Sequence, residues 1–317
     1  MRRRAPILAK VATMKPRVTL ATSADMPNLY SDEEGILDAL AERDCDPQIK
    51  QWDDPDVDWE DAGLVVVRSV SDYATRRDEF LEWSKAVPRI LNHPDILDWN
   101  SDKHYLKVLN EKYGLPVIPT TWLETEDNLT KHRVHSRFPA LQDFVIKPAV
   151  SSGLRDIGRY TAVDPASRRA AVTHVMDLLN EGRSVMLQRY QEAIDKHGEI
   201  TLVFFNGLVS HSVEKKAMLH PSQVTDEAMH ETLVQAREAT PEEWRWGEQI
   251  RAALHAYVKE RMGRDEQFLF NRVDVVPDGE GSFMVMEVGL VDAQLYLDSS
   301  PEAMKNFADA ISVRAHW

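Results

Sequence analysis

Residues 270–290, FNRVDVVPDGEGSFMVMEVGL, contain two apolar runs separated by a turn-forming segment. Phe270 to Val276 and Phe283 to Leu290 are rich in Val and Phe, which favour β-strands. The Pro-Asp-Gly-Glu-Gly segment between them, residues 277–281, is typical of a turn. This stretch therefore predicts an antiparallel hairpin, and it is the most informative part of the chain.

Charged residues on the predicted hairpin indicate a metal and phosphate site. If Val276 pairs with Phe283 across the turn, Glu287 faces Arg272 directly and lies diagonally from Asp274 on the same face. Two carboxylates of this kind suit Mg²⁺, which completes its shell with waters and nucleotide phosphates. An arginine beside them would neutralise a phosphoryl group during transfer. The alternative is an exposed strand pair that carries a surface ion pair.

The antiparallel pattern extends upstream of this hairpin. Asn206-Gly207 is a two-residue turn signal that joins residues 200–205 to residues 208–213. A strict two-residue turn places Glu199 and Lys215 on opposite faces of that strand pair. The later part of the chain is therefore expected to be an antiparallel sheet.

A second phosphate-binding candidate lies in the middle of the chain. The apolar strand 144–147 ends in Lys147, just before the Gly-containing loop from Ser151 to Gly158. A lysine at a strand end beside flexible backbone amides can bind phosphate. The alternative is a surface lysine whose aliphatic stem covers apolar surface.

The first hundred residues alternate predicted strands and helices, which is the rhythm of a parallel α/β unit. Ser31 and Glu34 predict a capping box at the start of the first helix. Substrate-binding candidates follow the later strands, where open parallel sheets bind ligands. These candidates are Arg68, Asp72, Asn92 and Asn100.

Composition excludes several function classes. The chain has 38 Lys+Arg and 52 Asp+Glu, a net charge of -14, which disfavours binding to nucleic acid or to an anionic membrane surface. Its single cysteine, Cys45, excludes an intrachain disulfide and suits a cytoplasmic location. No apolar run approaches the length of a membrane span, and P-loop and Gly-rich dinucleotide motifs are absent.

The ordered set of these segments resembles the ATP-grasp superfamily. The similarity is to its small bacterial ligases that look like prokaryotic glutathione synthetase and ribosomal-protein glutamate ligases, and it covers Val18 to Ala310. No single segment is specific for this superfamily, but the order of the segments is. The resembling stretches are residues 68–73, 91–103, 145–153, 187–190, 198–215, 271–274 and 286–287.

This resemblance implies an α/β fold in which a parallel N-terminal unit precedes two α+β subdomains that clamp ATP. The expected divisions are a disordered tail at 1–16, the N-terminal unit at 17–100, a central subdomain at 101–183 and a C-terminal subdomain at 184–317. Residues 216–240 show no firm strand pattern, and they are expected to be either a mobile cover or a helix. Met14 is an alternative start of translation.

The resemblance also implies roles for individual residues. Asp274 and Glu287 would hold Mg²⁺, with Mn²⁺ as an alternative, while Lys215 and Arg272 would steady the transferred phosphate. Glu199 would instead contact the ribose. The remaining residues implied to bind ATP are Lys103, Lys147, Ser151, Ser152, Gly153, Gln188, Arg189 and Tyr190.

One position departs from the family pattern. Family members carry a second metal-binding Glu or Asn two residues after the first, where this chain has Gly289. Three alternatives follow: Asp292 substitutes for the missing ligand, phosphates and water hold the second metal, or turnover is weak.

The expected activity is ATP-dependent joining of a carboxylate to an amine through an acyl phosphate, on small-molecule substrates and with a homodimer as one possible assembly. Similar members include the cyclo-ligase that closes D-cycloserine from O-ureido-D-serine, and a dipeptide or amide ligase is the alternative. Two rival functions are a nucleotide-binding module without catalysis and a small-molecule kinase that stops at phosphoryl transfer.

Overall fold

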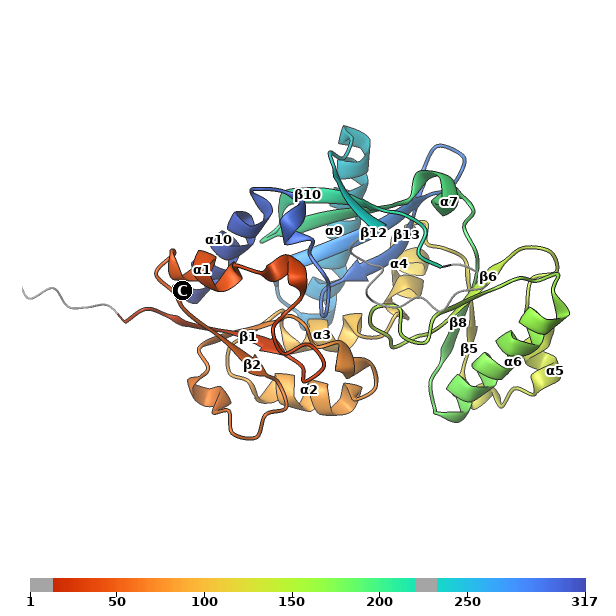
Figure 1. Cartoon of the computed structure of the whole chain (residues 1–317), viewed down its shortest axis with the longest axis horizontal. Coiled ribbons are helices and arrows are strands. Elements are labelled where there is room, and N and C mark those ends of the chain that lie inside the picture. Colours follow the sequence, from red (N-terminus) through yellow and green to blue (C-terminus); the bar gives the residue numbers. More distant parts are fainter. Residues whose placement is uncertain (1–13, 220–232) are drawn as a thin grey trace, which may run out of the picture.

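The computed structural model describes residues 14–219 and 233–317, which form three sheets (Figure 1). One hydrophobic core lies between the N-terminal and third sheets, and further cores lie on the other faces. Most of the expected tail and residues 220–232 of the expected cover lie outside the described residues. None of the described helices is both long enough and apolar enough to cross a membrane.

The N-terminal sheet is parallel throughout, as predicted, with strand order β2-β1-β3-β4. Val18 and Leu20 of β1 face one core and Ala21 faces the other, so both sides of the sheet are covered. Its strands are β1 (Arg17–Thr22), β2 (Asp46–Gln51), β3 (Leu64–Val67) and β4 (Ile90–Leu91). Its helices are α1 (Ile36–Ala41), α2 (Arg77–Ala86) and α3 (Pro94–Asn100).

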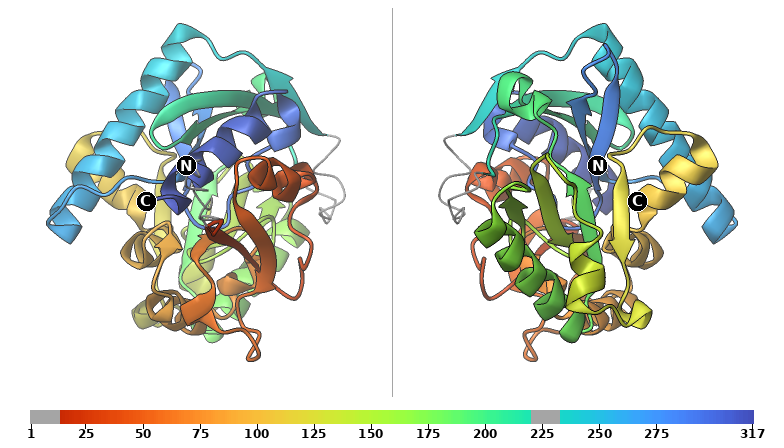
Figure 2. Two further views of the ribbon diagram at one scale, coloured as in Figure 1. Left: turned by 90° about the vertical axis from the view of Figure 1, so that its left-hand side faces the viewer. Right: turned by 90° about the vertical axis from the view of Figure 1, so that its right-hand side faces the viewer.

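The capping box predicted at Ser31 and Glu34 is wrong. Residues 31–33 form a short 3₁₀ turn, and α1 begins only after Gly35, whose φ of 94° interrupts a continuous helix. The C-terminal helix α10 (Ala303–Ala315) packs against α1, with Phe307 and Ile311 in the same core as β1 (Figures 1 and 2).

The central sheet forms a lobe at one end of the long axis of the molecule (Figure 1). Its strand order is β5-β8-β6-β7, and α5 (Lys131–His135) and α6 (Pro165–Asn180) pack on it. Asp164 caps α6 by accepting hydrogen bonds from the backbone of Ala166 and Ser167. The strands are β5 (Thr120–Leu123), β6 (Phe144–Pro148), β7 (Gly158–Tyr160) and β8 (Val185–Arg189). Because β8 pairs with β5 and β6, we propose that the central subdomain extends to Arg189 rather than to residue 183.

The third sheet is antiparallel, with order β11-β10-β9-β12-β13. Its strands are β9 (Glu199–Phe205), β10 (Leu208–Lys215), β11 (Val234–Arg237), β12 (Phe270–Pro277) and β13 (Phe283–Gly289). Three helices accompany it: α4 (Tyr105–Tyr113), α7 (Ala193–His197) and α9 (Pro241–Met262). Strand β11 lies in the segment for which a cover or a helix was expected, so that expectation is wrong for these four residues.

Candidate active site

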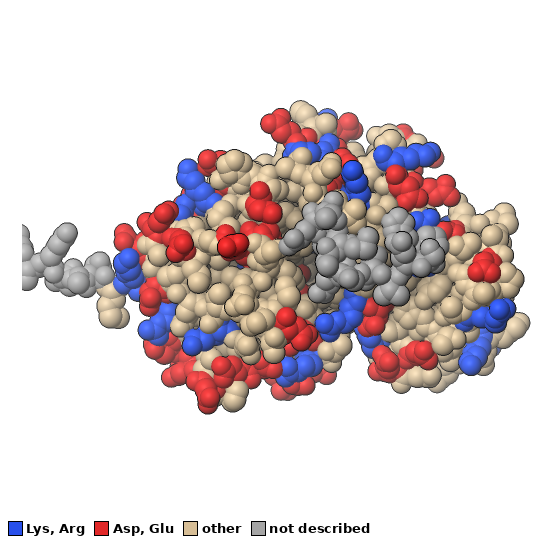
Figure 3. All heavy atoms as spheres, in the orientation of Figure 1, with Lys and Arg blue, Asp and Glu red and all other residues tan. Residues whose placement is uncertain are grey.

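A cavity of about 780 Å³ lies where the three sheets meet. The central and third sheets contribute side chains to it, together with the loop after β6, and the N-terminal unit contributes the segments that follow β1 and β3. The charged and hydroxyl-bearing lining residues include Tyr30, Tyr73, Lys147, Ser151, Ser152, Glu199, Lys215, Arg272, Glu287 and Asp292. On the face drawn in Figure 3, acidic and basic side chains are intermixed rather than gathered into a basic band.

The β12–β13 hairpin has a different register from the one predicted. Pro277 rather than Val276 pairs with Phe283, which shifts the pairing by one residue, and an irregularity between Asp274 and Val275 shifts it by one more. Asp274 therefore faces Glu287 directly. Gly289, not Glu287, is the residue opposite Arg272. The two carboxylates are therefore direct cross-strand partners, closer than the predicted diagonal arrangement.

A bulge also changes the β9–β10 hairpin. The register shifts between Val209 and His211, so Lys215 pairs with Glu199 directly. The opposite-face placement predicted from a strict turn is wrong, because one extra residue restores the two side chains to one face. Glu199 and Lys215 form an ion pair, which argues against a separate role for Glu199 at the ribose.

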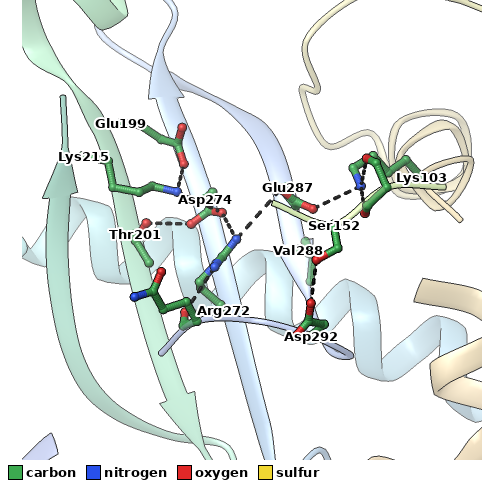
Figure 4. Close-up of polar contacts among 12 residues, drawn as sticks. Lys103, Ser152, Glu199, Thr201, Lys215, Arg272, Asp274, Glu287, Val288 and Asp292 are labelled. Carbon is green, nitrogen blue, oxygen red and sulfur yellow. Dashed lines mark hydrogen bonds and ion pairs between the residues drawn. The ribbon is translucent and has the colours of Figure 1, made fainter. Parts of the chain in front are cut away.

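These two register shifts assemble a buried charge network (Figure 4). Lys215 Nζ lies 3.3 Å from Asp274 Oδ2, and Arg272 Nη2 lies 2.8 Å from the same oxygen. Thr201 Oγ1 donates a hydrogen bond of 2.6 Å to Asp274 Oδ1. Burial lowers the pKa of Lys215, but the charges of Asp274 and Glu199 outweigh it and keep this pKa above its ordinary value.

Glu287 joins this network to Lys103, which in turn contacts Ser151 in the loop after β6. Its carboxylate lies 3.4 Å from Lys103 Nζ and 3.9 Å from Arg272 Nη2. Burial opposes ionisation, but Lys103, Arg272 and Lys147 together lower the pKa of Glu287 to about 2. Glu287 is therefore an ionised carboxylate at neutral pH, which is the form that binds a metal ion.

Lys147 is the cation best placed to receive a ligand. Lys103 Nζ is engaged, because it donates to Ser151 O at 2.9 Å and to Ser151 Oγ at 3.0 Å. Among the described residues, no hydrogen bond or ion pair forms to Lys147 Nζ, although the side chain is only 8% exposed. Burial lowers the pKa of Lys147 to about 8, with the charge of Lys103 acting in the same direction. An anionic ligand would relieve the cost of this buried, unpaired charge.

The residues after β6 and at the end of β8 line the same cavity. Gln188 Nε2 donates to Thr120 Oγ1 at 2.8 Å, and Tyr190 Oη donates to Asp195 Oδ1 at 2.6 Å. Arg159 lies over the Tyr190 ring at 3.5 Å from its centroid. The other lining residues from these two segments are Ser152, Gly153 and Arg189.

The donor set fits Mg²⁺ bound together with phosphates. In the described part of the chain, no three His, Cys, Asp or Glu side chains converge as a complete metal cage. Asp274 and Glu287 supply two facing carboxylates, and Asp274 Oδ2 has ion-pair neighbours but receives no hydrogen bond. Two carboxylates completed by waters and phosphates are an ordinary Mg²⁺ shell.

Gly289 is dictated by packing. A Cβ at this position would lie 2.7 Å from Ala293 Cβ, below any normal contact. Asp292 does not offer a free carboxylate either: Ser152 Oγ donates to its Oδ2 at 2.5 Å and Tyr30 Oη donates to its Oδ1 at 2.8 Å. Of the three alternatives for the second metal, ligation by phosphates and water fits this geometry best.

Replacing Gly289 by alanine is expected to destabilise the fold by about 1–3 kcal/mol, because the new methyl group overpacks against Ala293. Urea unfolding measures this difference. The double variant Gly289→Ala/Ala293→Gly is expected to recover part of the loss. An unchanged free energy of unfolding for Gly289→Ala would mean that the turn after β13 moves to make room for the methyl group without cost.

The four substrate candidates from the N-terminal unit do not line the cavity. Arg68 is fully buried and pairs with Glu33, and Asp72 accepts a hydrogen bond from Trp52 Nε1. Asn92 bonds to the backbone of Leu269, Phe270 and Leu290, and Asn100 to that of Val288 and Leu290. The two asparagines tie the N-terminal unit to the ends of β12 and β13, and Arg68 and Asp72 are held by Glu33 and Trp52, so we do not retain these four residues as substrate contacts.

Sequence reasoning missed Tyr30 and Tyr73, whose hydroxyl groups line the N-terminal side of the cavity. Tyr73 Oη donates to Ser151 O at 3.2 Å, and Tyr30 Oη donates to Asp292, which also accepts from the predicted Ser152. No local pattern singles out the two tyrosines. Their partners lie 78 to 262 positions away in the chain.

Two comparisons of sequence bear on this site. Residues 18–92 match a family described as D-cycloserine synthetase DcsG, N-terminal domain. The chain is also 34% identical over 311 residues to the cycloserine biosynthesis protein DcsG of Streptomyces lavendulae, a match that covers 96% of this chain and 98% of that protein.

Solved structures show the same similarity. The crystal structure of D-cycloserine synthetase DcsG superposes with a TM-score of 0.82 and 32% identity, over 94% of this chain and 99% of that one. D-alanine–D-alanine ligase from Bacillus anthracis complexed with ATP has a TM-score of 0.60 and 14% identity, over 94% and 98% of the two chains. The similarity to D-alanine–D-alanine ligase is a similarity of fold alone.

Proposed function

This chain belongs to the D-cycloserine synthetase family of ATP-grasp ligases, and on that premise we propose that it closes the D-cycloserine ring from O-ureido-D-serine. It is an ATP-dependent ligase that forms a carbon–nitrogen bond. The carboxyl carbon and the attacking nitrogen would belong to one molecule, so ring closure is the intramolecular form of this reaction. The observation that carries the proposal is that Lys147, Arg272 and Glu287 line one cavity, and that Asp274 pairs with Arg272 and faces Glu287 beside it.

In the first step, a carboxylate oxygen of the substrate attacks the γ-phosphorus of ATP and ADP leaves. Lys147 and Lys103 hold the phosphates at the end of β6, beside the backbone of Ser151 to Gly153. Mg²⁺ held by Asp274 and Glu287 would neutralise phosphate charge. Arg272 faces the same space and stabilises the charge that spreads over the transferred group.

In the second step, the substrate nitrogen attacks the acyl carbon and inorganic phosphate leaves. The protein's contribution is to hold the two reacting ends together, because an intramolecular attack needs the nitrogen within reach of the acyl carbon. The N-terminal side of the cavity, with Tyr30, Tyr73, Ser152 and Asp292, is the surface available to orient the substrate.

The test is a product assay with ATP, Mg²⁺ and O-ureido-D-serine, followed by measurement of ADP and by mass spectrometry. We expect one ADP for each ring formed. Matched reactions with D-alanine pairs and with other amino-acid and amine pairs are the controls. ADP release with those pairs alone would identify a dipeptide or amide ligase. A stable phosphorylated product would identify a kinase, and no ADP with any substrate would leave a nucleotide-binding module.

ATP affinity is expected to weaken as the pH rises above about 8. Only protonated Lys147 attracts phosphate, and burial lowers its pKa to about 8, so the attraction is present below that pH and is lost above it. The dissociation constant should rise by up to roughly tenfold per pH unit beyond this point. Calorimetric titration from pH 7 to 9.5 measures it, and Lys147→Arg, which stays charged, should lose this step. A flat profile for the unaltered protein would contradict this role.

A further inference from the structure

A series of hydrogen bonds links the backbone of Lys103 to the side chain of its neighbour His104, and we call this series the circuit. Lys103 N donates to Ala149 O at 2.9 Å, and Ala149 N donates to Ser184 O at 2.8 Å. Ser184 Oγ then donates to Glu124 Oε2 at 2.5 Å, and Glu124 Oε1 lies 3.1 Å from His104 Nε2. The circuit therefore starts and ends on adjacent residues, after passing the ends of β6, β8 and β5.

His104 closes this circuit through both ring nitrogens. Its Nδ1 lies 2.6 Å from Asp102 Oδ1, on its own loop, while its Nε2 faces Glu124. Ionised carboxylates only accept hydrogen bonds, so both nitrogens must donate, and the ring is the doubly protonated imidazolium. The ring stacks on Trp122 at 4.1 Å between centroids, a contact that also favours a cation.

We propose that the His104 imidazolium is a positioning residue for the nucleotide: by joining Asp102 to Glu124, it fixes Lys103 relative to the central sheet. Lys103 Nζ contacts Ser151 and lies near Glu287, at the phosphate end of the cavity. A shift of the Lys103 backbone would move this ammonium group away from the Ser151 loop. The inference rests on the proposed use of a nucleotide at this cavity.

The charges around His104 set the sign of its pH dependence. Asp102 precedes it, Glu124 and Glu126 come from the turn after β5, and Arg77 of α2 acts on Asp102. The hydrogen bond to Asp102 is the largest cause that raises the pKa of His104, and its partial burial opposes this effect. The protonated His104 ring therefore holds Lys103 in place below the ordinary histidine pKa of about 6.5. This effect is lost as the pH rises through the higher pKa of His104 in the folded protein.

The experiment combines histidine-ring NMR with calorimetry of Mg-ADP binding from pH 6 to 9. His104→Gln keeps one donor but cannot bridge two carboxylates. We expect its ADP affinity at pH 6.5 to be roughly tenfold weaker, the scale of one lost charge-assisted hydrogen bond. A plot of its ADP affinity against pH should lack the change caused by titration of His104 and keep the change caused by titration of Lys147 near pH 8. The ring of His104 in the unaltered protein should titrate above 6.5.

Two further variants separate positioning from general stability. His174→Gln is the matched control, because His174 is a partly buried histidine of the central unit that contacts Tyr160 and, among the described residues, forms no hydrogen bond to a carboxylate. It should bind ADP normally. Glu124→Gln should lower the NMR pKa of His104 and shift its affinity step to lower pH, which keeps the test decisive if His104→Gln folds poorly.

Unaltered ADP affinity and pH profile in His104→Gln would overturn the proposal, as would a His104 ring that titrates below 6.5. Failure of ring closure together with the expected ADP profiles would refute only the proposed substrate. Absence of ADP binding in the unaltered protein would refute both the nucleotide function and this role.

Discussion

Asparagine in place of Asp274 is expected to reduce kcat/KM by roughly 10³-fold, the upper range for removing one group that stabilises charge in a transition state. Asp274 is 1% exposed and faces Glu287 across the hairpin, so no other side chain on β12 can replace its carboxylate. Asparagine retains the oxygen that accepts from Thr201 but loses the negative charge between Lys215 and Arg272. The lost charge is the one expected to bind Mg²⁺.

The measurement is ADP release at increasing Mg²⁺ concentrations. A higher Mg²⁺ requirement in Asp274→Asn would point to the metal, and the melting temperature shows how much of the loss is structural, because removing one partner of a buried ion pair also destabilises. Asp265→Asn is the control, since Asp265 is exposed, forms an ion pair with Lys259 and lies outside the cavity lining. Wild-type kcat/KM in Asp274→Asn would contradict the proposed metal site.

Glutamine in place of Arg272 should lower kcat by roughly 10²–10³-fold and leave ATP affinity within a few-fold of normal. The reason is that the guanidinium lines the cavity and is aimed at the acid pair, where charge develops during phosphoryl transfer. Arg272→Lys keeps the charge but loses the planar fork, and an intermediate kcat is expected. The nearby ionised carboxylates hold the pKa of Arg272 above its ordinary value against burial, so this charge is present at every assay pH.

Single-turnover kinetics separates phosphoryl transfer from ATP binding in these variants. Arg251→Gln is the matched control, because Arg251 lies on α9 and pairs with Glu248 one helical turn away. If Arg272→Gln weakens ATP binding and leaves the transfer rate unchanged, Arg272 is a binding residue and its assignment to the transferred phosphate is wrong.

The polar segments between elements were predicted less well than the elements themselves. Apolar alternation and turn signals predicted the parallel N-terminal unit, the strand that ends at Lys147 and both hairpins. At Ser31 the local signal failed, because the positive φ of Gly35 delays the helix.

The sequence alone determined the fold class and which charged residues stand at the ends and on the faces of strands, because strand and helix periodicities and turn residues act over short distances. It could not determine which of those residues meet. In the β12–β13 hairpin, a one-residue change at the turn and a one-residue bulge together moved Glu287 from Arg272 to Asp274. In the β9–β10 hairpin, one bulged residue brought Glu199 opposite Lys215. The contacts of Asn92 and Asn100, and the meeting of Tyr30 with Asp292, join segments distant in the chain. Bulges and long-range contacts follow from packing between sheets, which only the tertiary structure decides.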